Sequence, residues 1–138
     1  MFYDLDATFA TPGAMYANLM SGYGVEHIQV SSLAVPLMQN AGFKDRFLTR
    51  AAELLSDKLS NRAVINEINA MTEELSAEVD RDFARYGKDR RSWEWSIEQL
   101  LYYVDDCDWR QQNIDALCFV FDLSSSERSH YFGSIDGA

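Results

Sequence analysis

The feature that most constrains the fold is a run of apolar residues at helical spacing between positions 64 and 86. Ser60 precedes this run as a favourable N-cap, and Gly87 follows it as a residue that can end a helix in the left-handed conformation. The sequence therefore predicts one long helix from Ser60 to Tyr86, with most of its acidic residues on a solvated face. The apolar residues recur every three or four positions and are Val64, Ile65, Ile68, Met71, Leu75, Val79, Phe83 and Tyr86.

Shorter amphipathic helices are predicted on both sides of the long one. Ser31 or Ser32 can cap a helix over 33–39, and a break at 40–42 precedes the next helix. Ser92 can cap a further helix, and the acidic run 105–108 can end it and begin another. The expected inward residues are Phe43, Phe47, Ala51, Leu54 and Leu55, then Trp93, Ile97, Leu100, Leu101 and Val104, then Trp109, Ile114, Leu117, Cys118 and Phe121.

These helices indicate a mainly α fold in which a helical bundle is preceded by a short extended segment. Apolar faces of this kind need one another for burial, since helix propensity alone would not order the chain. We expect a single helical domain over 1–138, divided into an extended segment with a loop (1–30), the bundle (31–123) and a tail (124–138). Within the tail, residues 124–129 are polar and expected to be loose, and residues 130–133 could dock or add a small strand.

The charge balance bears on which partners the chain can have. Twelve Lys and Arg residues stand against 22 Asp and Glu, giving a formal net charge of −10. Such a surface repels nucleic acid phosphates and anionic membranes, so neither is an expected partner. No apolar stretch is long enough to span a bilayer, and the opening residues do not resemble a signal peptide. The acidic surface favours solubility, and a basic protein partner is the alternative.

The cysteines and histidines give little indication of chemistry. One helix holding Cys107 and Cys118 would separate them by about 16 Å, too far for a disulfide. Neither has a ligand at zinc-site spacing, so we expect core or near-core thiols. His27 and His130 have no partner acid at a suitable spacing and are expected to be surface or capping residues.

Asp4 and Asp6 are the candidate metal ligands. In an extended segment, alternation places both carboxylates on one side and Leu5 on the other. Two hard oxygen ligands facing one way suit Mg²⁺ or Mn²⁺ bridging nucleotide phosphates. An EF-hand is excluded because Phe9 and Met15 occupy the positions of its glycine and its bidentate glutamate. Taken alone, the pair more commonly marks a turn or a strand end.

Six segments in order resemble the CotH family of spore-coat kinases and their secreted relatives. Residues 4–9 are similar to the family's Asp-x-Asp-x-x-Phe motif, and residues 43–55 to its Phe-x-x-Arg-Phe-x-x-Arg-Tyr-x-x-Leu-Leu helix. Residues 60–68 resemble the next helix start, 78–87 the Arg-His-x-x-Arg-Trp-Gly stretch, and 92–100 the Trp-containing helix. Residues 109–112 fall where the family has Tyr-Val-Arg, so the resemblance covers Asp4 to about Leu123.

This resemblance implies the C-terminal helical part of an atypical, kinase-like fold. In the complete enzyme, ATP with Mg²⁺ or Mn²⁺ supports phosphoryl transfer to protein Ser or Thr. Asp4 would bind the metal, and Asp6 is the family's second acid. The family's nucleotide-binding lysine, its acidic partner and its catalytic aspartate precede the motif. The implied partners are therefore an N-terminal kinase half and a protein substrate, and the implied location is the spore coat or the extracellular space.

Three functional hypotheses remain open from the sequence. The first is the helical portion of a CotH-type kinase, which supports the metal-binding segment and is inactive alone. The second is a non-catalytic helical interaction module of a secreted or spore-associated protein. The third is a stable helical domain with no independent role, in which Asp4 and Asp6 affect only local stability.

Overall fold

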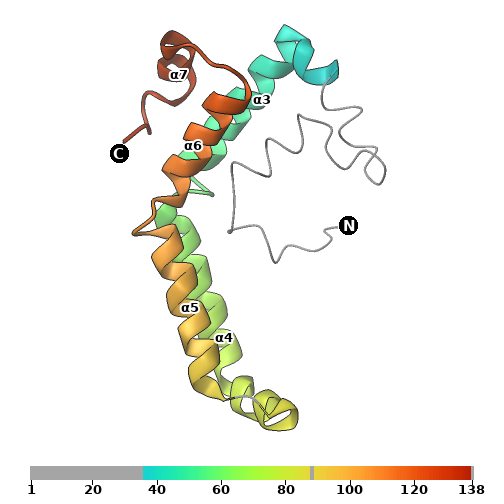
Figure 1. Ribbon diagram of the computed structural model, residues 1–138, viewed down its shortest axis with the longest axis vertical. Helices are drawn as coiled ribbons and strands as arrows, with labels where there is room; N and C mark the ends of the chain where they lie inside the picture. Colours follow the sequence, from blue (N-terminus) through green and yellow to red (C-terminus); the bar gives the residue numbers. More distant parts are fainter. Residues whose placement is uncertain (1–35, 88, 138) are drawn as a thin grey trace.

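The computed structural model describes residues 36–87 and 89–137, and these residues are mainly helical (Figure 1). The elements are α3 (Ala41–Ser56), α4 (Asn61–Tyr86), α5 (Arg90–Val104), α6 (Trp109–Val120) and α7 (Ser125–Phe132), and residues 36–39 are also helical. No strand occurs within these two ranges. The mainly α prediction is thereby confirmed for this part of the chain, whereas the extended segment predicted over 1–30 lies outside it.

The boundaries of the long helix α4 agree with the prediction. The Ser60 side chain accepts a hydrogen bond from the Ala63 amide at 3.3 Å, so it caps the helix as expected. Gly87 ends the helix at φ 65°, a left-handed conformation that glycine adopts without steric cost. Both ends are fixed by hydrogen bonds and backbone preferences that act within a few residues.

Two other predicted boundaries are wrong by up to three residues. The break at 40–42 is confined to Asn40, whose side chain accepts from the Phe43 amide and caps α3. The helix predicted to begin after Ser92 is capped instead by Asp89, whose carboxylate accepts from the Ser92 amide at 2.9 Å. A carboxylate at this position also interacts favourably with the helix dipole, so Asp89 is the stronger cap.

The helices are arranged as an arm and a core. Helices α4 and α5 run antiparallel and form the long arm, while α3, α6 and α7 gather at the end where α4 begins (Figure 1). The buried cluster lies at this end, and partly buried residues such as Phe47 pack around it, with the Phe47 and Phe121 rings 5.6 Å apart. The cluster consists of Met38, Leu48, Leu55, Val104, Trp109, Ile114, Leu117, Cys118, Phe121, Phe132 and Ile135.

The predicted apolar stripe of α4 is only partly buried. Val79 is buried, but Met71 is 54% exposed, Leu75 53% and Tyr86 65%. Two helices packed side by side cover only one face of each other, so the flank of the stripe remains in solvent. The sequence predicts the helix correctly but does not predict how much of its apolar face is covered.

The expectation that residues 124–129 are loose is wrong. Ser124 and Glu127 form a reciprocal capping box that starts α7. Phe132, at the end of this helix, is fully buried, and Ile135 beyond it is also buried. The docking predicted for residues 130–133 is therefore confirmed, but it occurs through a helix and not through a strand.

An ion-pair network attaches this last segment to α6. The Arg128 guanidinium donates to Asp136 at 2.6 Å and to Asp115 at 2.7 Å. The Gln111 side chain donates to Asp136 at 2.8 Å. The hydrogen bonds from Arg128 and then from Gln111 stabilise the charged carboxylate and lower the pKa of Asp136 to about 2.

We predict that this network makes stability fall as the pH drops from about 4 to 2. The pKa of Asp is about 3.9 in an unfolded chain and near 2 for Asp136 in the folded protein. The ionised Asp136 therefore stabilises the fold above about pH 4, and this stabilisation is lost as the pH falls to about 2. We expect the lowered pKa of Asp136 to contribute about 1 kcal/mol to the free energy of unfolding. This is less than the pKa difference alone would give, because Arg128 and Asp136 both remain partly in water. Urea unfolding of the wild type and of Asp136→Asn at a series of pH values measures it.

The variant should show a flatter pH dependence than the wild type in that range. Glu73→Gln removes an acid from an exposed position of α4 and serves as the matched control. If Asp136→Asn and Glu73→Gln follow the same pH dependence, the network does not have this role.

Candidate functional site

The predicted metal ligands Asp4 and Asp6 lie outside the described residues, as does His27. The fit of a metal to the two carboxylates is therefore not tested by the structure and stays a prediction. Among residues 36–87 and 89–137, no three His, Cys, Asp or Glu side chains come together as a metal site. His130 is exposed in the last turn of α7 and packs edge-on against Tyr131, as expected of a surface histidine.

The side chain of Asn61 links the arm to the core at their junction. The Asn61 Nδ2 group donates to Asp108 Oδ1 at 2.9 Å, and Asn61 Oδ1 accepts from the Arg110 amide at 3.0 Å. Asp108 also accepts from the Gln111 amide at 3.1 Å and so caps α6. Its φ of 48° lies in the left-handed region, which Asp tolerates better than most side chains. The first turns of α4 and α6 are thus fixed to each other.

Two shallow pockets flank this junction and share Ile65 and Asp105. The first has a volume of about 540 Å³ and contains two arginines, so it suits an anionic group. The second has a volume of about 360 Å³ and contains three acids. The remaining lining residues are Ser56, Ser60, Asn61, Arg62 and Arg110 in the first, and Asn69, Glu98, Leu101, Tyr102 and Asp106 in the second.

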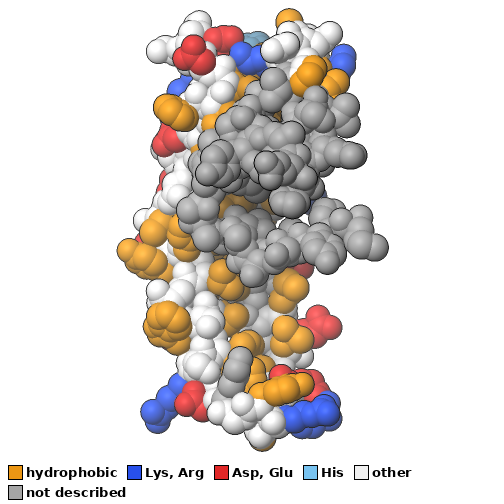
Figure 2. All heavy atoms as spheres, turned by 45° about the vertical axis from the view of Figure 1, so that its right-hand side comes forward, with side chains coloured by type: hydrophobic (Ala, Val, Ile, Leu, Met, Phe, Trp, Pro, Cys, Tyr) orange, Lys and Arg blue, Asp and Glu red, His pale blue; other side chains and the backbone are white. Residues whose placement is uncertain are grey.

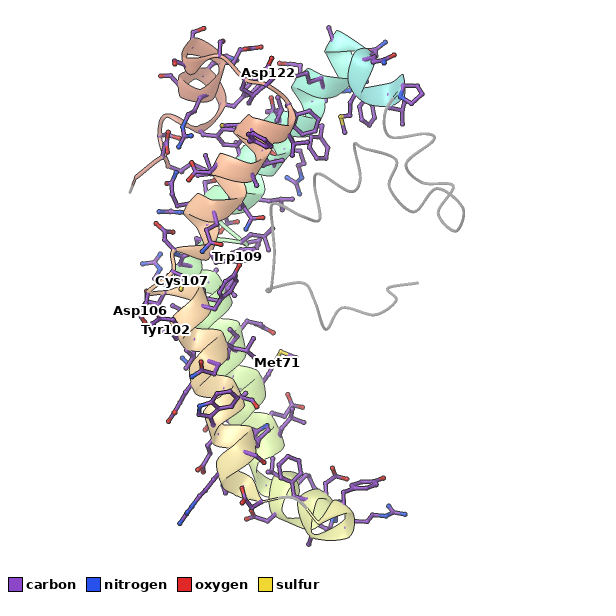
Figure 3. The ribbon with its side chains drawn as sticks, in the orientation of Figure 1. Met71, Tyr102, Asp106, Cys107, Trp109 and Asp122 are labelled. Carbon is purple, nitrogen blue, oxygen red and sulfur yellow. The ribbon has the colours of Figure 1, made fainter. Side chains whose placement is uncertain are left out.

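The Tyr102 phenol, which lines the acidic pocket, is not activated as a nucleophile. Tyr102, Asp106 and Cys107 lie together on the outer side of the junction (Figure 3). Electrostatic interaction with Cys107, a hydrogen bond with Cys107 and the charge of Asp106 raise the pKa of Tyr102, so the phenol stays protonated at neutral pH.

The cysteines agree with the sequence-based expectation. Cys107 and Cys118 are both free thiols, the first half-buried and the second buried in α6. Burial raises the pKa of Cys118, although the neighbouring Arg128 acts in the opposite direction. A thiol in this environment is protonated at neutral pH and belongs to the packing of the core.

A third hollow lies on the arm, towards the end far from the core. Its apolar residues are Leu75, Val79, Phe83 and Trp93, and its volume is about 520 Å³. The charged residues around these are Glu78, Arg81, Asp82 and Arg85. Figure 2 shows hydrophobic side chains along the surface of the arm, with basic and acidic ones near its end. We call this hollow, defined by these eight residues, the arm groove.

Sequence reasoning did not identify the junction or the arm groove. Asn61 and Asp108 are 47 positions apart, and nothing local to either residue indicates that they meet. The only local signal is the acidic run 105–108, which correctly predicts the end of one helix and the start of the next. The groove residues were assigned to an apolar stripe and a solvated face, and only the pairing of α4 with α5 brings Trp93 to them.

Comparison with known proteins supports the resemblance read from the sequence. The family model described as CotH kinase protein matches residues 1–109, which is more than half of the chain. No curated protein and no solved structure matches the chain. Separately, no helix within the described residues is long and apolar enough to cross a membrane.

We predict that the Asn61 bridge is a main source of stability at the junction. Asn61→Ala removes two hydrogen bonds and should lower the free energy of unfolding by about 1–2 kcal/mol. Denaturant unfolding measures this loss, and hydrogen exchange should show faster exchange of the Arg110 amide.

Asn66→Ala is the matched control, because Asn66 is an exposed asparagine on the same helix. Asn66→Ala makes the same chemical change in α4 without removing these two hydrogen bonds, so a larger loss for Asn61→Ala reports the bridge. Equal stability of the two variants would contradict this role.

Proposed function

The chain belongs to the CotH kinase protein family, and on that basis we propose that it is the C-terminal helical portion of a CotH-type atypical protein Ser/Thr kinase. In this proposal its helices support a metal-binding segment that contains Asp4 and Asp6. The chain does not catalyse phosphoryl transfer by itself. Its partner is an N-terminal kinase half, and the complete enzyme acts on a protein substrate with ATP and Mg²⁺ or Mn²⁺.

The observation that carries this proposal is the continuity of the family match. The match over residues 1–109 includes the Asp-x-Asp-x-x-Phe motif at 4–9 together with α3, α4 and α5. The motif and these helices are thus parts of one family unit. The divalent metal held by such a motif would bridge and neutralise the nucleotide phosphates. The helices of the described part would give the motif a rigid support, since Asn61 fixes the arm to the core.

The proposal that the chain is inactive alone follows from what phosphoryl transfer needs. The reaction depends on positioning the phosphates and the acceptor together, and one metal-binding segment does not position both. The family resemblance assigns the nucleotide-binding lysine, its acidic partner and the catalytic aspartate to sequence that precedes the motif. These groups are therefore expected from the N-terminal kinase half.

A second candidate function is a non-catalytic helical interaction module of a secreted or spore-associated protein. The exposed apolar side chains of the arm favour it, because contiguous apolar surface commonly marks a protein contact. Under this alternative, Asp4 and Asp6 are not needed for the chain's interactions.

We predict that the chain and its N-terminal kinase half together bind Mn²⁺–ATP or Mg²⁺–ATP, and that this binding depends on Asp4. Isothermal titration of the mixed halves measures it. Asp4→Ala should weaken binding by about tenfold or more, since a hard cation loses a carboxylate ligand. Asp6→Ala tests the second acid in the same way, and Glu73→Ala on the exposed face of α4 is the control.

Two outcomes would decide against the kinase proposal. One is the absence of both association and metal–nucleotide affinity when the halves are mixed. The other is a stoichiometric protein complex of the chain that is unaffected by Asp4→Ala and Asp6→Ala, without nucleotide binding. The second outcome would support the interaction module.

A further inference from the structure

The arm groove combines apolar surface with charges in a fixed order. Leu75 and its apolar neighbours Val79, Phe83 and Trp93 line the groove, and Leu75 is about half exposed. The neighbouring Met71, one turn earlier in α4, is exposed to the same degree. Exposed apolar side chains next to a hollow form a surface that a partner would bury favourably.

The charges of the groove residues reverse their sign about a point between Arg81 and Asp82, so residues at equal distances from that point carry opposite charges. Along α4 the order is Glu78, Arg81, Asp82 and Arg85, which reads minus, plus, minus, plus. When a second α4 is laid antiparallel about that point, Glu78 faces Arg85 and Arg81 faces Asp82. Each contact then occurs twice, as a two-fold symmetric interface requires. All four contacts join opposite charges.

These side chains are available for contacts between chains. Within one chain, Arg81 forms an ion pair with Glu78, and both stay largely in solvent at 82% and 56% exposure. An exposed ion pair of this kind contributes little to stability, so exchanging it for an equivalent pair with another chain costs little.

We propose that the arm groove is the contact surface for a second copy of this chain, with the two α4 helices packed antiparallel. The charges set the register, and Val79 and Phe83 lie within the segment in which the two α4 helices overlap. A uniformly basic partner would be repelled by Arg81 and Arg85, and a uniformly acidic one by Glu78 and Asp82. A partner whose charges alternate in this order matches all four, and the chain itself carries that order.

This proposal is independent of the proposed kinase function. The residues that line the groove lie between positions 75 and 93, at the end of α4 and the start of α5. Figure 1 shows this end of the arm far from the core, whereas Asn61 of the junction begins α4 next to the core. A small interface of this kind predicts a weak dimer, with a dissociation constant of about the micromolar range. Because its ion pairs are exposed, salt should weaken it.

The test uses two charge-reversal variants of the full chain and their mixture. Arg81→Glu with Arg85→Glu makes all four groove charges negative, and Glu78→Arg with Asp82→Arg makes all four positive. Analytical ultracentrifugation of the wild type should show a concentration-dependent dimer. Each variant alone should dimerise at least about tenfold more weakly, and an equimolar mixture should form a heterodimer.

Two controls separate the groove from general effects. Glu67→Arg with Glu73→Arg changes the net charge by the same amount as the all-positive variant, at exposed positions of α4 outside the groove, and should leave dimerisation in place. Phe119→Ser, at an exposed position on α6, should not weaken the dimer. Circular dichroism establishes that each variant keeps its helix content.

Several results would overturn the proposal. The first is a wild-type chain that stays monomeric at concentrations well above the micromolar range. The second is a pair of charge-reversal variants that do not associate when mixed although both are folded. The third is a dimer that responds equally to the groove variants and to the α4 control, which would show an effect of net charge alone.

Discussion

The hydrogen bonds of the Asn61 side chain link the arm to the core. The side-chain amide of Asn61 donates a hydrogen bond to Asp108, which caps α6, and accepts one from the backbone amide of Arg110. It therefore joins the first turns of two helices that are distant in sequence. An amide suits this position because it can donate and accept at once. Asp108 is the other half of the constraint, since its left-handed backbone turns the chain from the end of α5 into α6. The core packs on one side of this bridge, and the arm extends from the other.

The two ends of the molecule are stabilised in different ways. At the core end, α3, α6 and α7 bury a common cluster, and Arg128 ties the last segment to α6. In the arm, α4 and α5 have mainly each other to pack against, so several apolar side chains remain in solvent. Arg90 adds a polar connection there, because its guanidinium reaches Asp80 of α4 and Glu94 of α5. The arm therefore leaves more of its large apolar side chains in solvent than the core does.

Family membership and the described structure contribute different parts of the functional picture. The match to the CotH kinase protein family spans the motif with Asp4 and Asp6 and the helices through α5. The described residues supply the helical support, the junction and the arm groove. Metal binding by the two aspartates is inferred from the motif, while the dimer contact is inferred from the geometry of α4 and α5. The two proposals thus rest on separate observations.

The sequence by itself determined the mainly α character of the chain, the family and several helix ends. Ser60 and Gly87 were assigned correctly because caps act through hydrogen bonds and backbone preferences that span three or four residues. The Asp89 cap and the Ser124–Glu127 capping box are local signals of the same kind, but Ser92 competes with Asp89 as a cap and the polarity of residues 124–129 favours a loose segment. Asp4 and Asp6 remain sequence predictions.

Only the tertiary structure decided that Phe132 is buried whereas Leu75 is half exposed, and that Asn61 meets Asp108. Periodicity identifies the apolar face of a helix, but its burial depends on which other face the path of the chain brings against it.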